Sequence, residues 1–279
     1  MSGLETTIGA NAFRDFEIAG WEARADGYHR FFEPITGQVI EPLLDAARVG
    51  SGTRTLDVAT GPGYVAARAT VRRASVVGVD IAEHMVALAA SLHPAIPFRQ
   101  ANAENLPVAD GSFDAVVANF LVPHLGRPEQ AVVELARVLA PRGRLALTAW
   151  DVPERTRLIG VLLDAVELAG AKPPPALPPG PSFFRFSADD EFAGLLRHAG
   201  LAGIEIQTVS FPHRLSGPDE LWEGLLTGTI RTAPLVLWQT EGTQARIKRV
   251  FDRLMEQYAV DGGVELPVSV KLASGRKAR

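Results

Sequence analysis

Cysteine is absent from this chain of 279 residues. Its absence excludes disulfides, thiolate catalysis and cysteine-ligated metals, and it leaves the redox compartment undetermined. Long hydrophobic runs are missing too, and because a membrane-spanning helix needs about 20 apolar residues, we expect none. The first residues lack a basic segment followed by an apolar one, so no signal peptide is expected and a cytoplasmic protein is the default expectation.

Neither sign of charge is in large excess, since 28 lysines and arginines stand against 32 aspartates and glutamates, for a net charge of −4. Basic patches with interleaved aromatic residues are lacking, so we expect no nucleic-acid partner. No histidines or carboxylates have the spacing of metal ligands, so we expect no metal. A globular protein that handles small molecules is compatible with all of these exclusions.

The first 150 residues predict an α/β sheet domain preceded by helices. Aromatic residues interleaved with charge at 12–33 indicate two short helices, and 41–49 indicates a third. Apolar runs that predict strands then alternate with helical patterns. These strands are expected at 54–59, 75–80, 97–102, 113–120 and 143–150. Such alternation favours a parallel sheet covered by helices on both faces.

The pattern changes after Trp150. A helix is expected at 154–169, followed by a proline-rich segment at 172–181 that we interpret as a stiff surface linker, with a proline-rich docking ligand as the alternative. A helix at 187–200 would begin with Ser187 as N-cap and end at Gly200. The remaining expectations are a strand at 203–211, helices within 216–259 and a final strand at 266–275 that pairs with 203–211.

The stretch LDVATGPGYVA, residues 56–66, predicts a strand that ends in a glycine-rich turn before a helix. Gly61 and Gly63 would let the backbone approach a ligand closely, and the following helix N-terminus favours anionic groups. Gly61-x-Gly63-x-x-Ala66 fits the dinucleotide fingerprint, and Asp80 ends the next strand where a ribose-binding acid is expected. Asp57 inside the strand and Pro62 between the glycines argue against a bound pyrophosphate.

Several segments, in order and at family spacing, resemble the class I S-adenosylmethionine-dependent methyltransferases, in the group that includes the ubiquinone and menaquinone C-methyltransferases. The segments are LDVATGPG, GVDIAEHMV, NAENLP, SFDAVVANFLVPHL and ELARVLAPRGRLALTAW. Together they cover about residues 50–150. Thr60 and Arg142 depart from the family pattern, at a position usually cysteine or glycine and at the first glycine of a Pro-Gly-Gly.

The resemblance implies a Rossmann-like, seven-stranded sheet of order 3-2-1-4-5-7-6 whose last strand is antiparallel. It implies N-terminal helices at 1–49 that cover the cofactor site, a core at 50–150 and a helical lid at 151–260 that includes one core strand near 203–211. Residues 261–279 would hold the final core strand and a tail. The implied cofactor is S-adenosyl-L-methionine, with S-adenosyl-L-homocysteine as product.

Cofactor contacts carry over from the family to the matching positions of this chain. The methionine part is expected at Asp57, Ala59, Gly61 and Gly63, with Asn119 and Phe120 on the same side. Asp80 would take the ribose hydroxyls. Ile81 and Met85 would pack on the adenine, and Asn102 and Ala103 would read its edge. Thr60 and Glu104 lie within the matched segments, and Tyr28 is expected at the carboxylate end of the donor.

Methyl transfer from a sulfonium needs positioning more than acid–base chemistry, because the methyl carbon is already activated. His124, after the fourth strand, is a candidate for catalysis or substrate contact, with a structural role as the alternative. His29, in the N-terminal aromatic stretch, is the second candidate, because N-terminal helices in such enzymes often close over the cofactor.

The expected partner is a small, partly hydrophobic methyl acceptor, since the lid segment is rich in apolar side chains. The same side chains equally fit a core of the lid or a homodimer contact, and the sequence leaves these three open. The side chains are Phe183, Phe184, Phe186, Leu221, Trp222, Leu225, Leu226, Leu235, Leu237 and Trp238. Two other functions stay open: a cofactor-binding protein of this fold with non-methylating chemistry, such as a cyclase, and an NAD(P)-dependent oxidoreductase.

Overall fold

A computed structural model describes residues 3–278 of the chain, with side chains from residue 9 onward. The strands are β1 (Arg54–Val58), β2 (Ser75–Asp80), β3 (Phe98–Gln100), β4 (Phe113–Ala118), β5 (Leu139–Trp150), β6 (Leu201–Leu215), β7 (Ala259–Val260) and β8 (Gly263–Lys277). The helices are α1 (Gly3–Thr36), α2 (Ile40–Ala46), α3 (Tyr64–Val71), α4 (Glu83–Leu92), α5 (Pro128–Val138), α6 (Arg157–Leu168), α7 (Asp189–His198), α8 (Pro218–Gly228), α9 (Pro234–Leu237) and α10 (Glu241–Met255).

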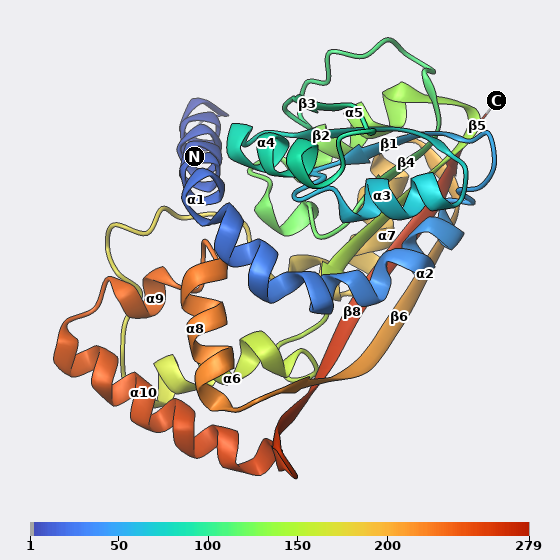
Figure 1. Cartoon of the computed structure of the whole chain (residues 1–279). Coiled ribbons are helices and arrows are strands. Elements are labelled where there is room, and N and C mark those ends of the chain that lie inside the picture. The colour runs from blue at the N-terminus through green and yellow to red at the C-terminus, as the bar shows by residue number, and fades with distance from the viewer. Residues whose placement is uncertain (1–2, 279) are drawn as a thin grey trace.

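The strands form one sheet of order β3-β2-β1-β4-β5-β8-β6, in which β3 through β5 run parallel (Figure 1). The final strand β8 lies between β5 and β6 and is antiparallel to both. The predicted order 3-2-1-4-5-7-6 is therefore confirmed, with β8 as its seventh strand. The two-residue β7, which pairs with the start of β8, was not predicted.

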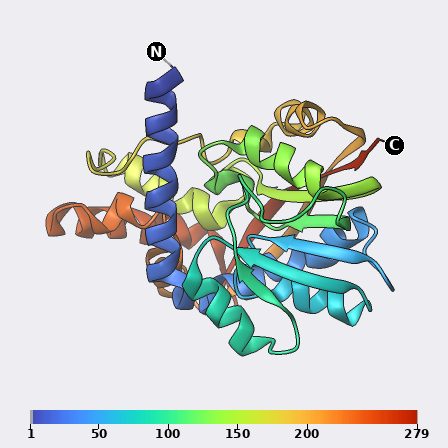
Figure 2. The same cartoon turned by 90° about the horizontal axis from the view of Figure 1, so that it is seen from above.

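Both faces of the sheet are covered by helices, because alternate residues of each buried strand point to opposite sides. Leu56 and Val116 pack with the apolar faces of α5 and α7. Ala115 and Val117, which flank Val116 in β4, pack with α2 and α3 on the other face. The near-continuous apolar strands of the sequence follow from this double burial. Figure 2 shows the sheet between its helices.

Strands β6 and β8 extend beyond the rest of the sheet. β5 ends where Trp150 pairs with Val270, whereas β6 continues along β8 to the pair Leu215 and Val264. The projecting part packs against α6, α8 and α10 in a separate apolar cluster. The helical segments after β5 are thus supported by two strands of the same sheet.

The N-terminal segment forms one helix of 34 residues, α1, so the expectation of two short helices was wrong. Gly20 and Gly27 were compatible with a break, but in the structure they are contact points for the region around α8. A Cβ on Gly20 would lie 2.5 Å from Ile230, and one on Gly27 would lie 2.4 Å from the carbonyl oxygen of Thr227. Tertiary packing offsets their low helix propensity.

The expected N-cap of α7 was also wrong. The helix begins at Asp189 after Ala188, and no side chain caps it. The Ser187 hydroxyl instead donates a hydrogen bond of 2.7 Å to the carbonyl of Phe184, because a short 3₁₀ turn at Arg185–Ser187 precedes the helix. Residues 172–181 contain no helix or strand. None of the helices within residues 3–278 combines the length and apolar character needed to cross a membrane.

Candidate functional site

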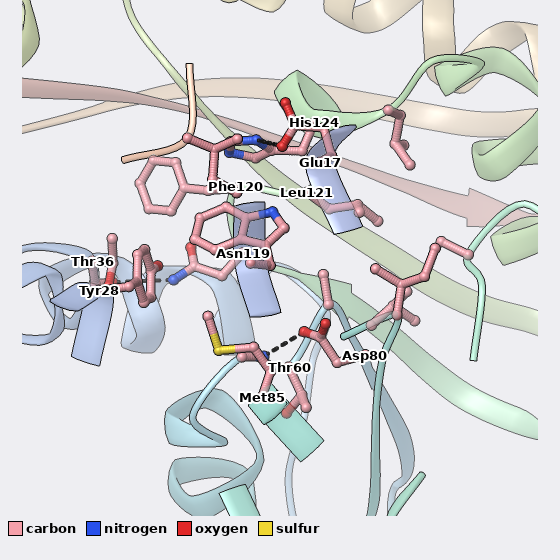
Figure 3. Close-up of a pocket in the computed structure, with 18 of the residues that line it drawn as sticks. Glu17, Tyr28, Thr36, Thr60, Asp80, Met85, Asn119, Phe120, Leu121 and His124 are labelled. Carbon is pink, nitrogen blue, oxygen red and sulfur yellow. Dashed lines mark hydrogen bonds and ion pairs between the residues drawn. The ribbon is translucent and has the colours of Figure 1, made fainter. Parts of the chain in front are cut away.

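A deep pocket opens at the carboxyl ends of β1, β2 and β4, the edge where ligands bind in parallel α/β sheets (Figure 3). Its empty space is about 1400 Å³ counted to the open mouth. One wall is the loop after β1, together with residues 80–104. The opposite wall is α1, with residues 119–126, Phe183 and residues 228–232. The pocket therefore joins the sheet domain to the segments before and after it.

The loop after β1 leaves a bare stretch of backbone toward the pocket. Ala59, Thr60 and Gly61 line it, and both Ala59 (φ 54°) and Gly61 (φ 51°) have left-handed backbone conformations. A Cβ on Gly61 would meet no atom within 4 Å, so the space beside this backbone is open. The turn thus forms a cradle against which another molecule can lie.

Asp57 lies beneath this loop and not in the pocket wall. One of its carboxylate oxygens accepts hydrogen bonds from the Thr60 hydroxyl (2.6 Å) and the Ala66 N–H (3.0 Å), so it holds the turn and caps the start of α3. Its other oxygen is buried with no partner among the described residues. Burial raises the pKa of Asp57 to about 7. Gly63 also lies outside the wall, at the start of α3.

Asp80, at the end of β2, presents its carboxylate to the pocket. Its oxygens accept hydrogen bonds from the N–H groups of Gly61 (2.9 Å) and Ala82 (3.0 Å), which fix its orientation. Burial raises its pKa, although these N–H groups oppose the shift. A carboxylate held this way, beside an open backbone cradle, suits a pair of neighbouring hydroxyl groups.

The wall beyond Asp80 contains the residues expected around an adenine. Ile81, Met85, Asn102, Ala103 and Glu104 all line the pocket. The Asn102 side chain accepts a hydrogen bond of 2.9 Å from the Glu104 N–H and so shapes this turn. The Glu104 carboxylate is 4% exposed and pairs with Arg127 at 2.9 Å. Within this wall, then, Glu104 is a fixed, paired group.

Asn119 and Phe120 occupy the end of β4 and are locked by two neighbours. The Thr148 hydroxyl donates to the Asn119 side chain (2.6 Å) and accepts from the Phe120 N–H (2.8 Å). The Asn119 amide also donates to the Thr36 carbonyl of α1 (3.2 Å). Phe120 has a φ of 58° and stacks on Trp150 with ring centroids 4.0 Å apart. Such a conformation in a bulky residue is uncommon and is held by these contacts.

Aromatic residues of α1 form the roof of the pocket. Tyr28 lines it, stacks on Phe32 at 5.3 Å and meets the edge of Trp21 at 5.3 Å. Burial raises the pKa of Tyr28 to about 12, so its hydroxyl keeps its proton and can donate. His29, on the same helix, does not line the pocket, and its Nδ1 is hydrogen-bonded to the Tyr64 hydroxyl.

His124 lines the pocket in a short 3₁₀ turn after β4, with Glu17 of α1 beside it. Its Nδ1 lies 2.9 Å from a Glu17 carboxylate oxygen. The sequence left ten apolar side chains open between acceptor contact, a lid core and a dimer contact. Phe183 alone of these lines the pocket, while most of the others pack in the apolar cluster around α6, α8 and α10. No group of three or more histidine, aspartate or glutamate side chains within the described part of the chain could hold a metal ion.

Several pocket residues were missed from the sequence. They come from α1 and from the turn between α8 and α9, and they are Arg14, Glu17, Ile18, Trp21, Phe32, Thr36, Ile230 and Arg231. The aromatic stretch at 12–33 marked α1 as a cover. Its periodicity could have shown that positions 14, 17, 18 and 21 share one helix face, had one continuous helix been assumed.

Residues 56–147 match the family of methyltransferase domains. The biotin biosynthesis bifunctional protein BioHC of Cellvibrio japonicus is 40% identical over 33% of this chain and 18% of its own length. A demethylmenaquinone methyltransferase of Paenarthrobacter aurescens is 28% identical over 68% of this chain and 79% of its own length. This chain spans less than half the length of the first curated relatives it matches.

Solved structures share the fold. The YcgJ protein of Bacillus subtilis matches with a TM-score of 0.59 at 22% identity, over 87% of this chain and 99% of that one. The [4+2]-cyclase SpnF matches with a TM-score of 0.52 at 21% identity, over 86% and 81% of the two chains. Phosphoethanolamine N-methyltransferase 2 of Haemonchus contortus, solved with S-adenosylhomocysteine, matches at 0.57 and 17% identity, over 96% and 60%.

The domain match identifies residues 56–147 as a methyltransferase domain, and the sheet has the strand order expected for the class I S-adenosylmethionine-dependent methyltransferases. They support S-adenosylmethionine as the cofactor. The pocket fits it on three observations of its own: the open cradle at Gly61, the oriented carboxylate of Asp80 and the wall that Ile81, Met85 and Ala103 form beyond it.

Proposed function

We propose that this chain transfers a methyl group from S-adenosylmethionine to a small, partly apolar molecule bound between α1 and residues 228–232. The observation that carries the proposal is the continuity of one pocket. Its cofactor end holds Gly61 and Asp80, and its other end continues among Trp21, His124 and Phe183. Two molecules can therefore meet inside a space that α1 screens from water.

The chain's own residues would mainly orient and desolvate the reactants. The loop at Gly61 and the Asp80 carboxylate would hold the cofactor, which supplies an activated methyl group when bound. Asn119 and Phe120, locked by Thr148, would line the reacting end. The aromatic roof on α1 would exclude water from the acceptor.

Calorimetric titration with S-adenosylhomocysteine, comparing the wild-type protein with Asp80→Ala, tests the cofactor site. Two charge-assisted hydrogen bonds of about 1.5–3 kcal/mol each would be lost, so we expect the affinity to fall by roughly 100-fold or more. Asp261→Ala, which removes an exposed carboxylate far along the sequence, is the matched control and should leave the affinity unchanged. Equal affinity of the wild type and Asp80→Ala would contradict the proposal.

A second function is a cyclase-like reaction that uses the same cofactor site without methyl transfer. The shared fold with the [4+2]-cyclase SpnF favours keeping it as an alternative. Incubation with methyl-labelled S-adenosylmethionine and candidate acceptors separates the two, because only a methyltransferase places the label in a product.

We also propose that residues 151–260 act as the lid that selects the acceptor, and that the protein is a cytoplasmic homodimer. Support for the dimer comes from Leu237 and Trp238, which are 40% and 47% exposed although both are large and apolar. Light scattering of the wild type and of Trp238→Ser would test it, and a monomeric wild-type protein would contradict it.

A further inference from the structure

Glu17 carries a carboxylate into the acceptor end of the pocket, where few polar groups lie. Its side chain is 4% exposed, and one oxygen lies 2.9 Å from Nδ1 of His124 (Figure 3). The other oxygen is buried with no partner among the described side chains and backbone. A buried carboxylate is costly unless it serves a charged or donating partner, and His124 is the partner that it has.

His124 is held in one orientation by its surroundings. The edge-on rings of Trp21 and Phe183 lie 5.0 and 5.6 Å from the imidazole, centroid to centroid. Because Nδ1 donates its proton to the Glu17 carboxylate, the neutral ring carries its lone pair on Nε2. Nε2 has no hydrogen-bond partner in the described part of the chain, and the side chain lines the pocket.

Two arginines complete the charge around this pair. Arg231, from the turn after α8, lies over the Phe183 ring at 5.4 Å and donates to the carbonyls of Pro123 and Pro181. Arg14 of α1 lines the same end and pairs with Asp15. Neither arginine is hydrogen-bonded to Glu17, so the carboxylate is available to His124.

We propose that His124 is the general base of the reaction and that Glu17 is its positioning residue, so that the acceptor loses a proton from an O–H, N–H or acidic C–H group. This inference rests on the proposed methyltransferase function and narrows its substrate class. Acceptors that gain a methyl group without losing a proton, such as thioethers and tertiary amines, have no use for such a base.

The proton balance follows from the geometry. The acceptor oxygen, nitrogen or carbon forms its new bond to the methyl carbon, and the sulfur of the departing thioether keeps the electron pair of the broken bond. The acceptor's proton moves to Nε2 of His124. The resulting imidazolium is stabilised by the Glu17 carboxylate until the proton is released to solvent.

A purely structural reading is that the ion pair only fastens α1 to the turn after β4. The base additionally requires a free lone pair on Nε2, and the kinetics described below separate the two readings. ¹⁵N NMR of histidine-labelled protein bound to S-adenosylhomocysteine identifies the protonated nitrogen of neutral His124, with His124→Asn as the assignment control. We expect the proton on Nδ1. A neutral ring protonated on Nε2 would overturn the proposal.

Kinetics supply the second measurement, with an acceptor panel of phenols and primary amines, each paired with a thioether or tertiary amine of similar size. Label from S-adenosylmethionine should enter the O–H and N–H members of the panel. His124→Asn should lower kcat by about 100-fold, and Glu17→Gln by roughly tenfold with little change in KM.

Matched controls are available on the same chain. Glu33→Gln changes an exposed glutamate of α1, and His198→Gln changes an exposed histidine of α7. Both should behave as wild type. The role of His124 as general base would be overturned if label entered the thioethers or tertiary amines, or if the rate of His124→Asn were unchanged. Because Glu17 and His124 are separate from Asp80, their variants should still bind S-adenosylhomocysteine, whereas failure of the proposed function would show as no binding by the wild type.

Discussion

The cofactor end of the pocket is formed by residues within 58–104, a continuous part of the chain that runs from the end of β1 through β2 and β3, three neighbouring strands. The acceptor end is formed by side chains from α1, the turn after β4, Phe183 and residues 228–232. The first end is polar and rests on hydrogen bonds of the backbone to buried carboxylates. The second is aromatic and contains the hydrogen-bonded pair of Glu17 and His124. One end is thus set by local chain geometry, and the other by how distant segments pack.

The buried carboxylate of Asp57 should give the largest effect on stability, and it belongs to the cofactor end. Its pKa of about 7 lies above the value in an unfolded chain, so the folded protein binds the proton more tightly. The free energy of unfolding should therefore fall as pH rises from about 4 to 7 and level off above, a loss of roughly 4 kcal/mol. Asp57→Asn should remove the part of this slope that comes from Asp57.

Urea unfolding of both proteins across that pH range measures the difference. Asp80 contributes in the same direction, so a smaller slope persists in Asp57→Asn. Parallel curves for the two proteins would show that Asp57 is ionised in the folded state.

Packing of α1 tests the acceptor end. In Gly27→Ala the new Cβ would lie 2.4 Å from the Thr227 carbonyl oxygen, a backbone atom that cannot turn away. We expect a loss of about 1–3 kcal/mol in the free energy of unfolding. Gly9→Ala is the control on the same helix, since its Cβ meets no atom within 4 Å and alanine favours a helix. Thermal unfolding should move down in the first variant and slightly up in the second.

The smallest expected effect on stability separates strain from binding at the cofactor end. Gly61→Ala places a Cβ in the open cradle at a left-handed φ, at a cost of about 1–2 kcal/mol. Gly52→Ala has a similar φ and open surroundings but lies outside the pocket. Both should lose similar stability, and only Gly61→Ala should weaken S-adenosylhomocysteine binding, by about tenfold or more. Equal binding by both variants would place the cofactor elsewhere.

Sequence reasoning reached the sheet and the cofactor end because each depends on residues close together in the chain. A strand, a glycine-rich turn and an acidic residue at the end of the next strand follow one another in the sequence. Their order and spacing predicted the positions of Gly61 and Asp80. The partners of Asp57 could not be predicted in this way. The family resemblance implied that its carboxylate faces the ligand, whereas in the structure it accepts hydrogen bonds from Thr60 and Ala66.

Most residues of the acceptor end could not be predicted from the sequence, for a physical reason. Glu17 and His124 are 107 residues apart, and only the placement of α1 brings them together. That placement depended on glycines whose local preference favours a break, and tertiary contacts reversed it. The sequence left the apolar residues after Trp150 open between acceptor contact, core and dimer contact. Nothing local distinguishes Phe183, which lines the pocket, from Leu221, which lies in the apolar cluster around α6, α8 and α10.

The position of β8 imposes an order on assembly during synthesis. This strand is the last in sequence, yet it lies inside the sheet and is the element to which β6 is bonded. Until residues 263–277 leave the ribosome, β5 is an open edge and β6 has no place to attach. The helices α8 to α10 are therefore synthesised before the strand that completes the sheet. Until β8 pairs with β5, the unpaired edge of the nascent chain is exposed to edge-to-edge association.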